Sequence, residues 1–192
     1  MFRVITFLVV LFAAKLSMAG DMLSIAFEDS TMTVDSERVH CDLYYILLGD
    51  DGAMEKGDLI QVSQLHEDRE HYGVSRARFV FSDDMERLTV SWPAVGNEKV
   101  GSTEKARLDV IDADSLRISY RIDQHDDKSQ VGQKLRARIV DFRQLPEWVR
   151  NEVTPSIIAK LPPSEQLLYH KMQAEQIRVT SEIINGYLDA ID

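Results

Sequence analysis

The stretch SLRISYRID, residues 115–123, decides how this chain folds. Its apolar and polar residues alternate strictly along the chain. Leu116, Ile118, Tyr120 and Ile122 share one side, and Arg117, Ser119 and Arg121 share the other. Because successive side chains of an extended chain point to opposite faces, this pattern predicts a strand with one face in a core and one in water.

The same alternation recurs from Leu23 to Phe142. It is found in LSIAF (23–27), TMTV (31–34), RVHCDLYYILL (38–48), DLIQVSQLH (58–66), VSRARFVF (74–81), ERLTVSW (86–92), KARLDVI (105–111) and QKLRARI (133–139). Short turn-forming segments separate these runs, and short connections favour antiparallel hairpins. The sequence therefore predicts an α+β, mainly β fold, with an antiparallel meander of about nine strands that forms a barrel or a sandwich.

The period changes after Leu145. Pro146 and the EWVRNEV that follows predict a short helix, which Thr154-Pro155 should interrupt. Pro162-Pro163 should end it, and a long amphipathic helix should then run from Ser164 to the end of the chain. We expect a β domain over residues 20–145 and a helical segment over residues 146–192, packed on the β domain or on a partner.

Residues 1–19 have the pattern of a secretory signal peptide. Arg3 precedes an apolar run, and small residues precede Gly20. The apolar run stops at Lys15, which is short of the roughly 20 residues that a spanning helix needs. We expect cleavage after Ala19, a mature protein in the periplasm or outside the cell, and no transmembrane segment after the signal is removed.

The chain is acidic, with 32 Asp and Glu against 22 Lys and Arg and a net charge of −10. Residues 21–72 carry most of the excess, with 13 acidic and 3 basic residues. Nucleic acid is therefore excluded as an expected partner, because phosphate binding needs a net-basic face.

The lone cysteine and the histidines are candidates for chemistry. Cys41 lies between His40 and Asp42, but in a strand both neighbours point away from the thiol, which predicts a packing role. In QLHEDREHYG, residues 64–73, an imidazole with carboxylates could hold Zn²⁺. Its candidate ligands are His66, Asp68 and His71, and a solvated hairpin tip is the favoured alternative. No cofactor is predicted.

Arginine recurs on the outward side of the predicted strands. The candidate binding residues are Arg76, Arg78, Arg117, Arg121, Arg136 and Arg138, with Arg87 and Arg107 on the same side. These arginines either pair with acids such as Glu104 and Asp109, or form a docking surface for a carboxylate- or phosphate-bearing partner.

The end of the long helix is a second candidate contact. Ile183, Tyr187 and Ile191 share its apolar side. They are predicted to bind another envelope protein or a second copy of the chain.

The chain has no G-x-S-x-G, phosphate-binding glycine loop, H-E-x-x-H or C-x-x-C motif, so no catalytic residue is predicted. The sequence favours an exported, non-enzymatic binding or accessory protein of the bacterial cell envelope that acts by protein–protein interaction. One alternative is a carrier of a small apolar ligand in a lipocalin-like barrel. Another is a hydrolase with a dispersed site of carboxylates and histidine.

Overall fold

The computed structural model describes residues 22–34, 37–50, 53–67, 72–94 and 101–189. The predicted signal peptide, residues 1–19, lies outside this part. The strands are β1 (Met22–Glu28), β2 (Thr31–Val34), β3 (Glu37–Asp50), β4 (Ala53–Leu65), β5 (Tyr72–Phe81), β6 (Arg87–Ser91), β7 (Thr103–Asp112), β8 (Arg117–His125) and β9 (Lys134–Val140). Within these described ranges the helices are two 3₁₀ turns, η1 (Lys128–Gln130) and η2 (Phe142–Gln144), and two α-helices, α2 (Glu147–Lys160) and α3 (Pro163–Asp189).

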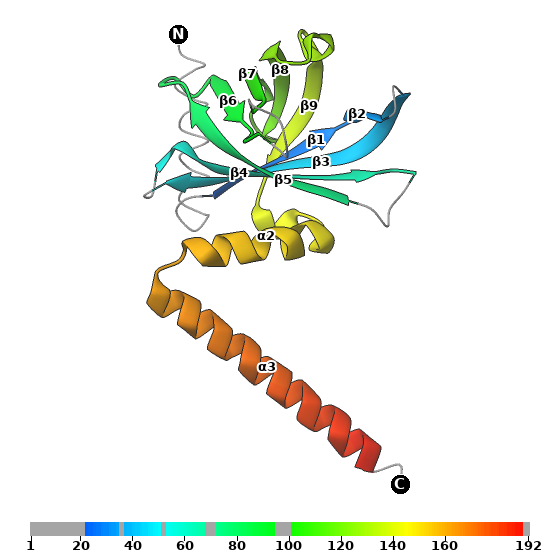
Figure 1. Ribbon diagram of the computed structural model, residues 1–192, viewed down its shortest axis with the longest axis vertical. Coiled ribbons are helices and arrows are strands. Elements are labelled where there is room, and N and C mark those ends of the chain that lie inside the picture. Colours follow the sequence, from blue (N-terminus) through cyan, green and yellow to red (C-terminus); the bar gives the residue numbers. More distant parts are fainter. Residues whose placement is uncertain (1–21, 35–36, 51–52, 68–71, 95–100, 190–192) are drawn as a thin grey trace. The chain divides into compact units, whose positions relative to one another are not determined.

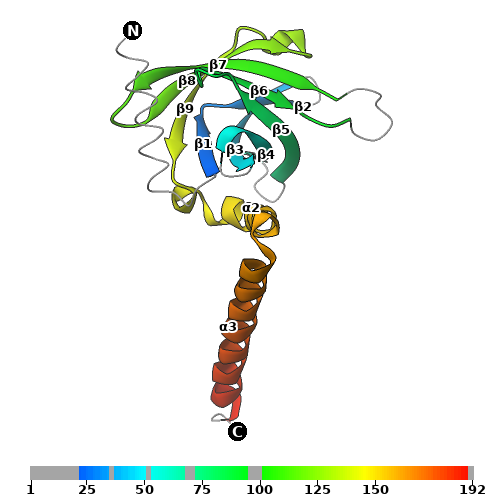
Figure 2. The same cartoon turned by 90° about the vertical axis from the view of Figure 1, so that its left-hand side faces the viewer.

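The strands form a closed antiparallel barrel (Figures 1 and 2). From β3 to β9 each strand pairs with the next one along the chain, and β1 closes the ring by pairing with both β9 and β3. Eight strands make up the ring, and β2 pairs with the first four residues of β3. The predicted meander of about nine strands is confirmed, and the structure selects the barrel over the sandwich.

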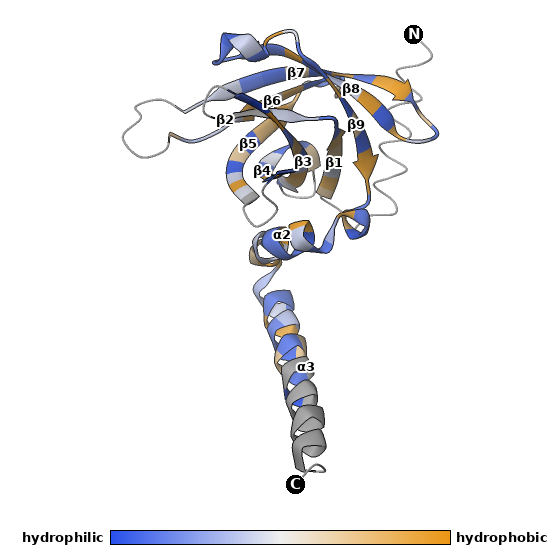
Figure 3. Cartoon of the chain, turned by 90° about the vertical axis from the view of Figure 1, so that its right-hand side faces the viewer, coloured by the Kyte–Doolittle hydropathy of each residue, from blue (hydrophilic) through white to orange (hydrophobic). Residues whose placement is uncertain are grey.

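The barrel's own side chains fill its interior. Phe27 lies edge-on to Tyr45 and to Tyr120, with ring centroids 4.9 and 5.0 Å apart. Phe79 and Tyr120 have 0% and 1% of their surface exposed. Apolar and polar residues alternate along strands such as β5, as Figure 3 shows. An eight-stranded barrel is just wide enough for its side chains to pack against one another, so this interior is the hydrophobic core.

Strands β3 and β4 are apolar on their outer side as well. Ile46 and Ile60 lie directly opposite each other, out of phase with the residues of the barrel core, and both are buried. Trp148, in the first turn of α2, lies edge-on to Tyr44 with ring centroids 5.9 Å apart. This turn therefore covers apolar surface that the strands present outward.

The helical segment differs from the prediction at one proline. Thr154-Pro155 was expected to interrupt the first helix, but α2 continues through Pro155. That prediction is wrong, because a proline removes a single backbone donor and the turns on either side keep their own hydrogen bonds. Pro162-Pro163 does separate α2 from α3, and the chain divides into two compact units after Arg150.

Candidate functional site

The outer face of β6 to β9 carries a row of cationic side chains. Strand pairing places Arg87 of β6 opposite Arg107 of β7, and Arg107 opposite Arg121 of β8. Lys134 of β9 is opposite Arg121 in turn. We call these four residues the cationic row. Like charges directly opposite each other destabilise a sheet, so this arrangement has a cost in folding free energy.

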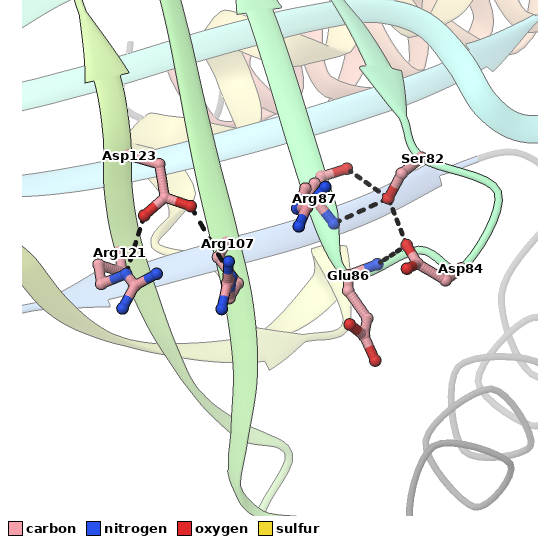
Figure 4. A network of polar contacts seen from close by, with 7 residues as sticks. All are labelled: Ser82, Asp84, Glu86, Arg87, Arg107, Arg121 and Asp123. Atoms are coloured by element: carbon pink, nitrogen blue, oxygen red, sulfur yellow. Dashed lines mark hydrogen bonds and ion pairs between the residues drawn. The ribbon is translucent and has the colours of Figure 1, made fainter. Parts of the chain in front are cut away.

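One acidic residue lies within the cationic row. Asp123 accepts a hydrogen bond from Nε of Arg121 at 2.9 Å, and its other oxygen lies 3.8 Å from Nε of Arg107 (Figure 4). A register shift opposite Lys105 and Ala106 leaves Asp123 as an extra residue in β8. Asp123 lies two residues after Arg121 and on the same face, so its carboxylate sits between Arg107 and Arg121.

At the β6 end of the row, the nearby acid is bound by its own turn. The Asp84 carboxylate accepts hydrogen bonds from the Ser82 hydroxyl and from the Glu86 N–H (Figure 4). The Ser82 bond contributes most to lowering the pKa of Asp84, and the charge of Arg87 contributes less. The Arg87 N–H donates to the Ser82 hydroxyl at 3.0 Å, so the same turn also fixes the start of β6.

Several arginines of the predicted binding set lie outside the cationic row and form ion pairs with acids of the same chain. Arg117 and Arg138 lie opposite each other, and both bind Glu28, with N to O distances of 3.0 and 3.4 Å. The hydrogen bond from Arg117 is the main cause of the lowered pKa of Glu28. The mutual repulsion of these two arginines is therefore compensated within the barrel.

Arg78 is likewise compensated. Its guanidinium bridges Asp50 and Asp58, and these two hydrogen bonds raise the pKa of Arg78. Arg76 lies exposed on the outer face of the same strand, and Arg136 is exposed on β9 in register with Glu28.

The cationic row thus contains a single member of the predicted binding set, Arg121. Arg87 and Arg107 were recognised as outward arginines but were not selected. The distinguishing signal is cross-strand register, which alternation along a single strand does not reveal.

A second polar group lies inside the barrel. Glu104 of β7 is buried; one carboxyl oxygen accepts a hydrogen bond from the Tyr120 hydroxyl at 2.5 Å. Its other oxygen lies 3.9 Å from Nε2 of His125. Burial raises the pKa of Glu104, although the Tyr120 hydrogen bond and the nearby His125 favour the carboxylate.

The neighbours of this buried group leave little room for substrate chemistry. Nδ1 of His125 accepts a hydrogen bond from the Asp127 N–H at 3.0 Å, which puts the proton of the neutral ring on Nε2, facing Glu104. Both ring nitrogens and both carboxyl oxygens therefore face protein groups. A general acid or base must reach its substrate, so this geometry suits a structural role and not catalysis.

The sequence interpretation placed Glu104 on the outer face as a partner for arginine, and that placement is wrong. Ala106 and Leu108, which follow at alternate positions in β7, are buried in the core together with it. The alternation that assigned those two residues to the interior extends back to Glu104 and was the signal that could have found it.

Of the three predicted metal ligands, His66 lies in the described part of the chain. Nε2 of His66 lies 2.9 Å from Oδ1 of Asp42, and the ring stacks on His40 with centroids 6.2 Å apart. Asp68 and His71 lie outside the described residues. Among the residues that are described, no group of three or more His, Cys, Asp or Glu is placed to hold a metal ion.

Cys41 is buried in β3, with its Sγ 3.7 Å from the Ser30 hydroxyl. The same hydroxyl donates to the Cys41 carbonyl at 2.7 Å. Burial raises the pKa of the thiol, which keeps it in the less nucleophilic protonated form. This environment agrees with the interpretation of Cys41 as a packing residue.

The side chains predicted as the helical contact fall outside the described part of the structure. Ile183 and Tyr187 belong to α3, and Ile191 lies beyond its end. Earlier in α3, Leu168 and Met172 lie one turn apart with 59% and 65% of their surface exposed. No helix in the described ranges has both the length and the hydropathy of a membrane span.

No protein-family model, curated protein or solved structure matches this chain.

Proposed function

We propose that the protein is an exported, non-enzymatic binding protein of the bacterial cell envelope, and that it binds a partner protein through the outer face of β6 to β9. The observation that carries this proposal is the cationic row. Arg87, Arg107 and Arg121 lie abreast on three neighbouring strands, followed by Lys134 on a fourth.

Other arginines on the outer surface of the barrel are compensated by acids of the same chain. Glu28 binds Arg117 and Arg138 together, and two aspartates bind Arg78. In the cationic row, by contrast, Asp123 is the one acid that forms ion pairs among the described residues, and it faces two of the four cations. A row of cations that is only partly compensated and costs folding free energy is typical of a surface kept for an anionic partner.

The core supports a surface function over that of a carrier. A carrier needs a cavity of about 300 Å³ or more, lined by inward residues. Phe79 and Tyr120, which would line it, have almost no exposed surface and pack against other aromatic rings. The internal engagement of Glu104 and His125 also favours a binding protein over a hydrolase.

The site of action and the partner are part of the same proposal. Residues 1–19 direct export, with cleavage after Ala19, and the mature protein acts in the periplasm or outside the cell. The exposed apolar residues of α3 support a second contact, either with the same envelope protein or with a second copy of the chain.

Capture of the partner with charge-reversal variants tests this proposal. The tagged full-length protein is produced in its own cells as wild type, as Arg87→Glu/Arg107→Glu and as Arg38→Glu/Lys56→Glu. The control pair makes the same charge change at exposed positions on β3 and β4. We expect a protein that co-purifies with the wild type and the control, and that is reduced about tenfold or more with the row variant. Equal recovery with all three forms would refute the role of the row.

A further inference from the structure

Each gap in the cationic row is the space between two cationic side chains on neighbouring strands. One gap already holds an anion, the carboxylate of Asp123. Asp123 places one carboxylate oxygen 2.9 Å from Nε of Arg121 and the other 3.8 Å from Nε of Arg107. A single carboxylate therefore spans two arginines on neighbouring strands, whose backbones are about 4.8 Å apart.

The next gap along the row also lies between two arginines. Arg87 and Arg107 are direct partners in the β6–β7 register, as Arg107 and Arg121 are in the β7–β8 register. Asp84 of the β5–β6 turn, whose pKa the charge of Arg87 helps to lower, is bound by Ser82 and by the Glu86 N–H. Among the described residues, no ion pair spans Arg87 and Arg107.

We propose that the gap between Arg87 and Arg107 binds a side-chain carboxylate of an acidic segment of the partner protein, in the way that Asp123 occupies the adjacent gap. This inference rests on the proposed function and adds the chemistry of the partner. The planar guanidinium forks of two arginines match the two oxygens of a carboxylate.

The cationic row suits a protein carboxylate better than a phosphate polymer. The group that the row itself holds is a carboxylate. The chain carries a net charge of −10, so a long polyanion would be repelled beyond the four residues of the row. A short acidic segment, in contrast, needs contact with the row alone.

The inference makes an unusual prediction for Asp123. If Asp123 occupies a gap that a partner carboxylate can also use, then Asp123→Asn removes the competing negative charge from that gap. Binding of an acidic segment should then become tighter. A purely structural role for Asp123 would leave binding unchanged or weaken it.

A fluorescent hexaglutamate peptide is the probe, with binding to the purified full-length protein measured by anisotropy at low ionic strength. We expect saturable binding that weakens about fivefold with Arg87→Gln and with Arg107→Gln. Arg38→Gln is the matched control and should bind as the wild type does. Asp123→Asn should bind the peptide about threefold more tightly. Circular dichroism of each variant establishes that the barrel is intact.

Two comparisons separate the outcomes. Short-chain polyphosphate that binds more tightly than hexaglutamate, with the same arginine dependence, would overturn the carboxylate assignment. So would the absence of arginine-dependent hexaglutamate binding, or weaker binding by Asp123→Asn. If partner capture depends on Arg87 and Arg107 but hexaglutamate does not displace the partner, the proposed function stands and this inference fails. If capture does not depend on the row, the proposed function itself fails.

Discussion

Two residues near the end of β8 show how much depends on single positions. Asp123 is the extra residue at the register shift and binds arginine outside the barrel, whereas His125, two residues later, faces Glu104 inside it. A regular strand would place residues 123 and 125 on the same face. The bulge therefore leaves Asp123 on the outer face that it shares with Arg121, and turns His125 inward toward Glu104.

Glu104 should make the stability of the protein depend on pH. Its pKa is raised above 4.5 in the folded state, so folded protein binds this proton more tightly than unfolded protein does. Burial of the charged form then costs stability at high pH, and this cost disappears as the pH falls below 4.5. Glu104→Gln removes the charge and keeps an oxygen for the Tyr120 hydroxyl. Relative to wild type, its free energy of unfolding should rise by about 1 kcal/mol between about pH 4.5 and pH 8.

Urea unfolding of both proteins across this range measures the effect. Glu86→Gln, at a half-exposed turn position, makes the same substitution outside the core and is the control. A Glu104→Gln difference that stays flat, or that shrinks as the pH rises, would show that Glu104 is not held as a buried acid.

At the scale of elements, the β3–β4 hairpin depends on two facing glycines. Gly49 and Gly57 are direct partners in the register, next to the shift between Gly49 and Asp50. A Cβ on Gly57 would lie 2.0 Å from the Leu48 carbonyl oxygen, which is backbone and has no rotamer to change. The hairpin requires glycine here for close approach of the two chains.

Gly57→Ala should lower the free energy of unfolding by about 3 kcal/mol, because the backbone of one strand must shift. Gly73→Ala is the matched control, since its nearest contact is the Ser63 hydroxyl at 3.1 Å, a side chain that can rotate. It should cost less than about 1 kcal/mol. Thermal or urea unfolding compares the two, and equal losses would contradict the close approach seen in this hairpin.

At the scale of the whole molecule, alternation predicted most of the fold. SLRISYRID became β8 with Ile118, Tyr120 and Ile122 buried, and the meander followed from the short turns. Closure depended on β1 pairing with both β3 and β9, a long-range contact that no local pattern encodes. The continuous α2 was missed because proline weakens a helix without always ending it.

The candidate site was predicted less completely for the same reason. The outward arginines were visible in the sequence, but their division into compensated pairs and the cationic row depends on register between strands. A shift of one residue in β8 would move Arg121 away from Arg107 and turn it toward the other face. Glu104 was missed because its charge was taken to outweigh its place in the alternation.

The most direct test of the central claim is site-specific photo-crosslinking in intact cells. A photoreactive amino acid replaces Thr89, which lies two residues from Arg87 on the outer face of β6, or His40, which is exposed on β3. Our account predicts an adduct from position 89 with an acidic envelope protein, lost with Arg87→Gln/Arg107→Gln, and no such adduct from position 40. Equal adducts from both positions, or an adduct from position 89 that persists with Arg87→Gln/Arg107→Gln, would contradict it.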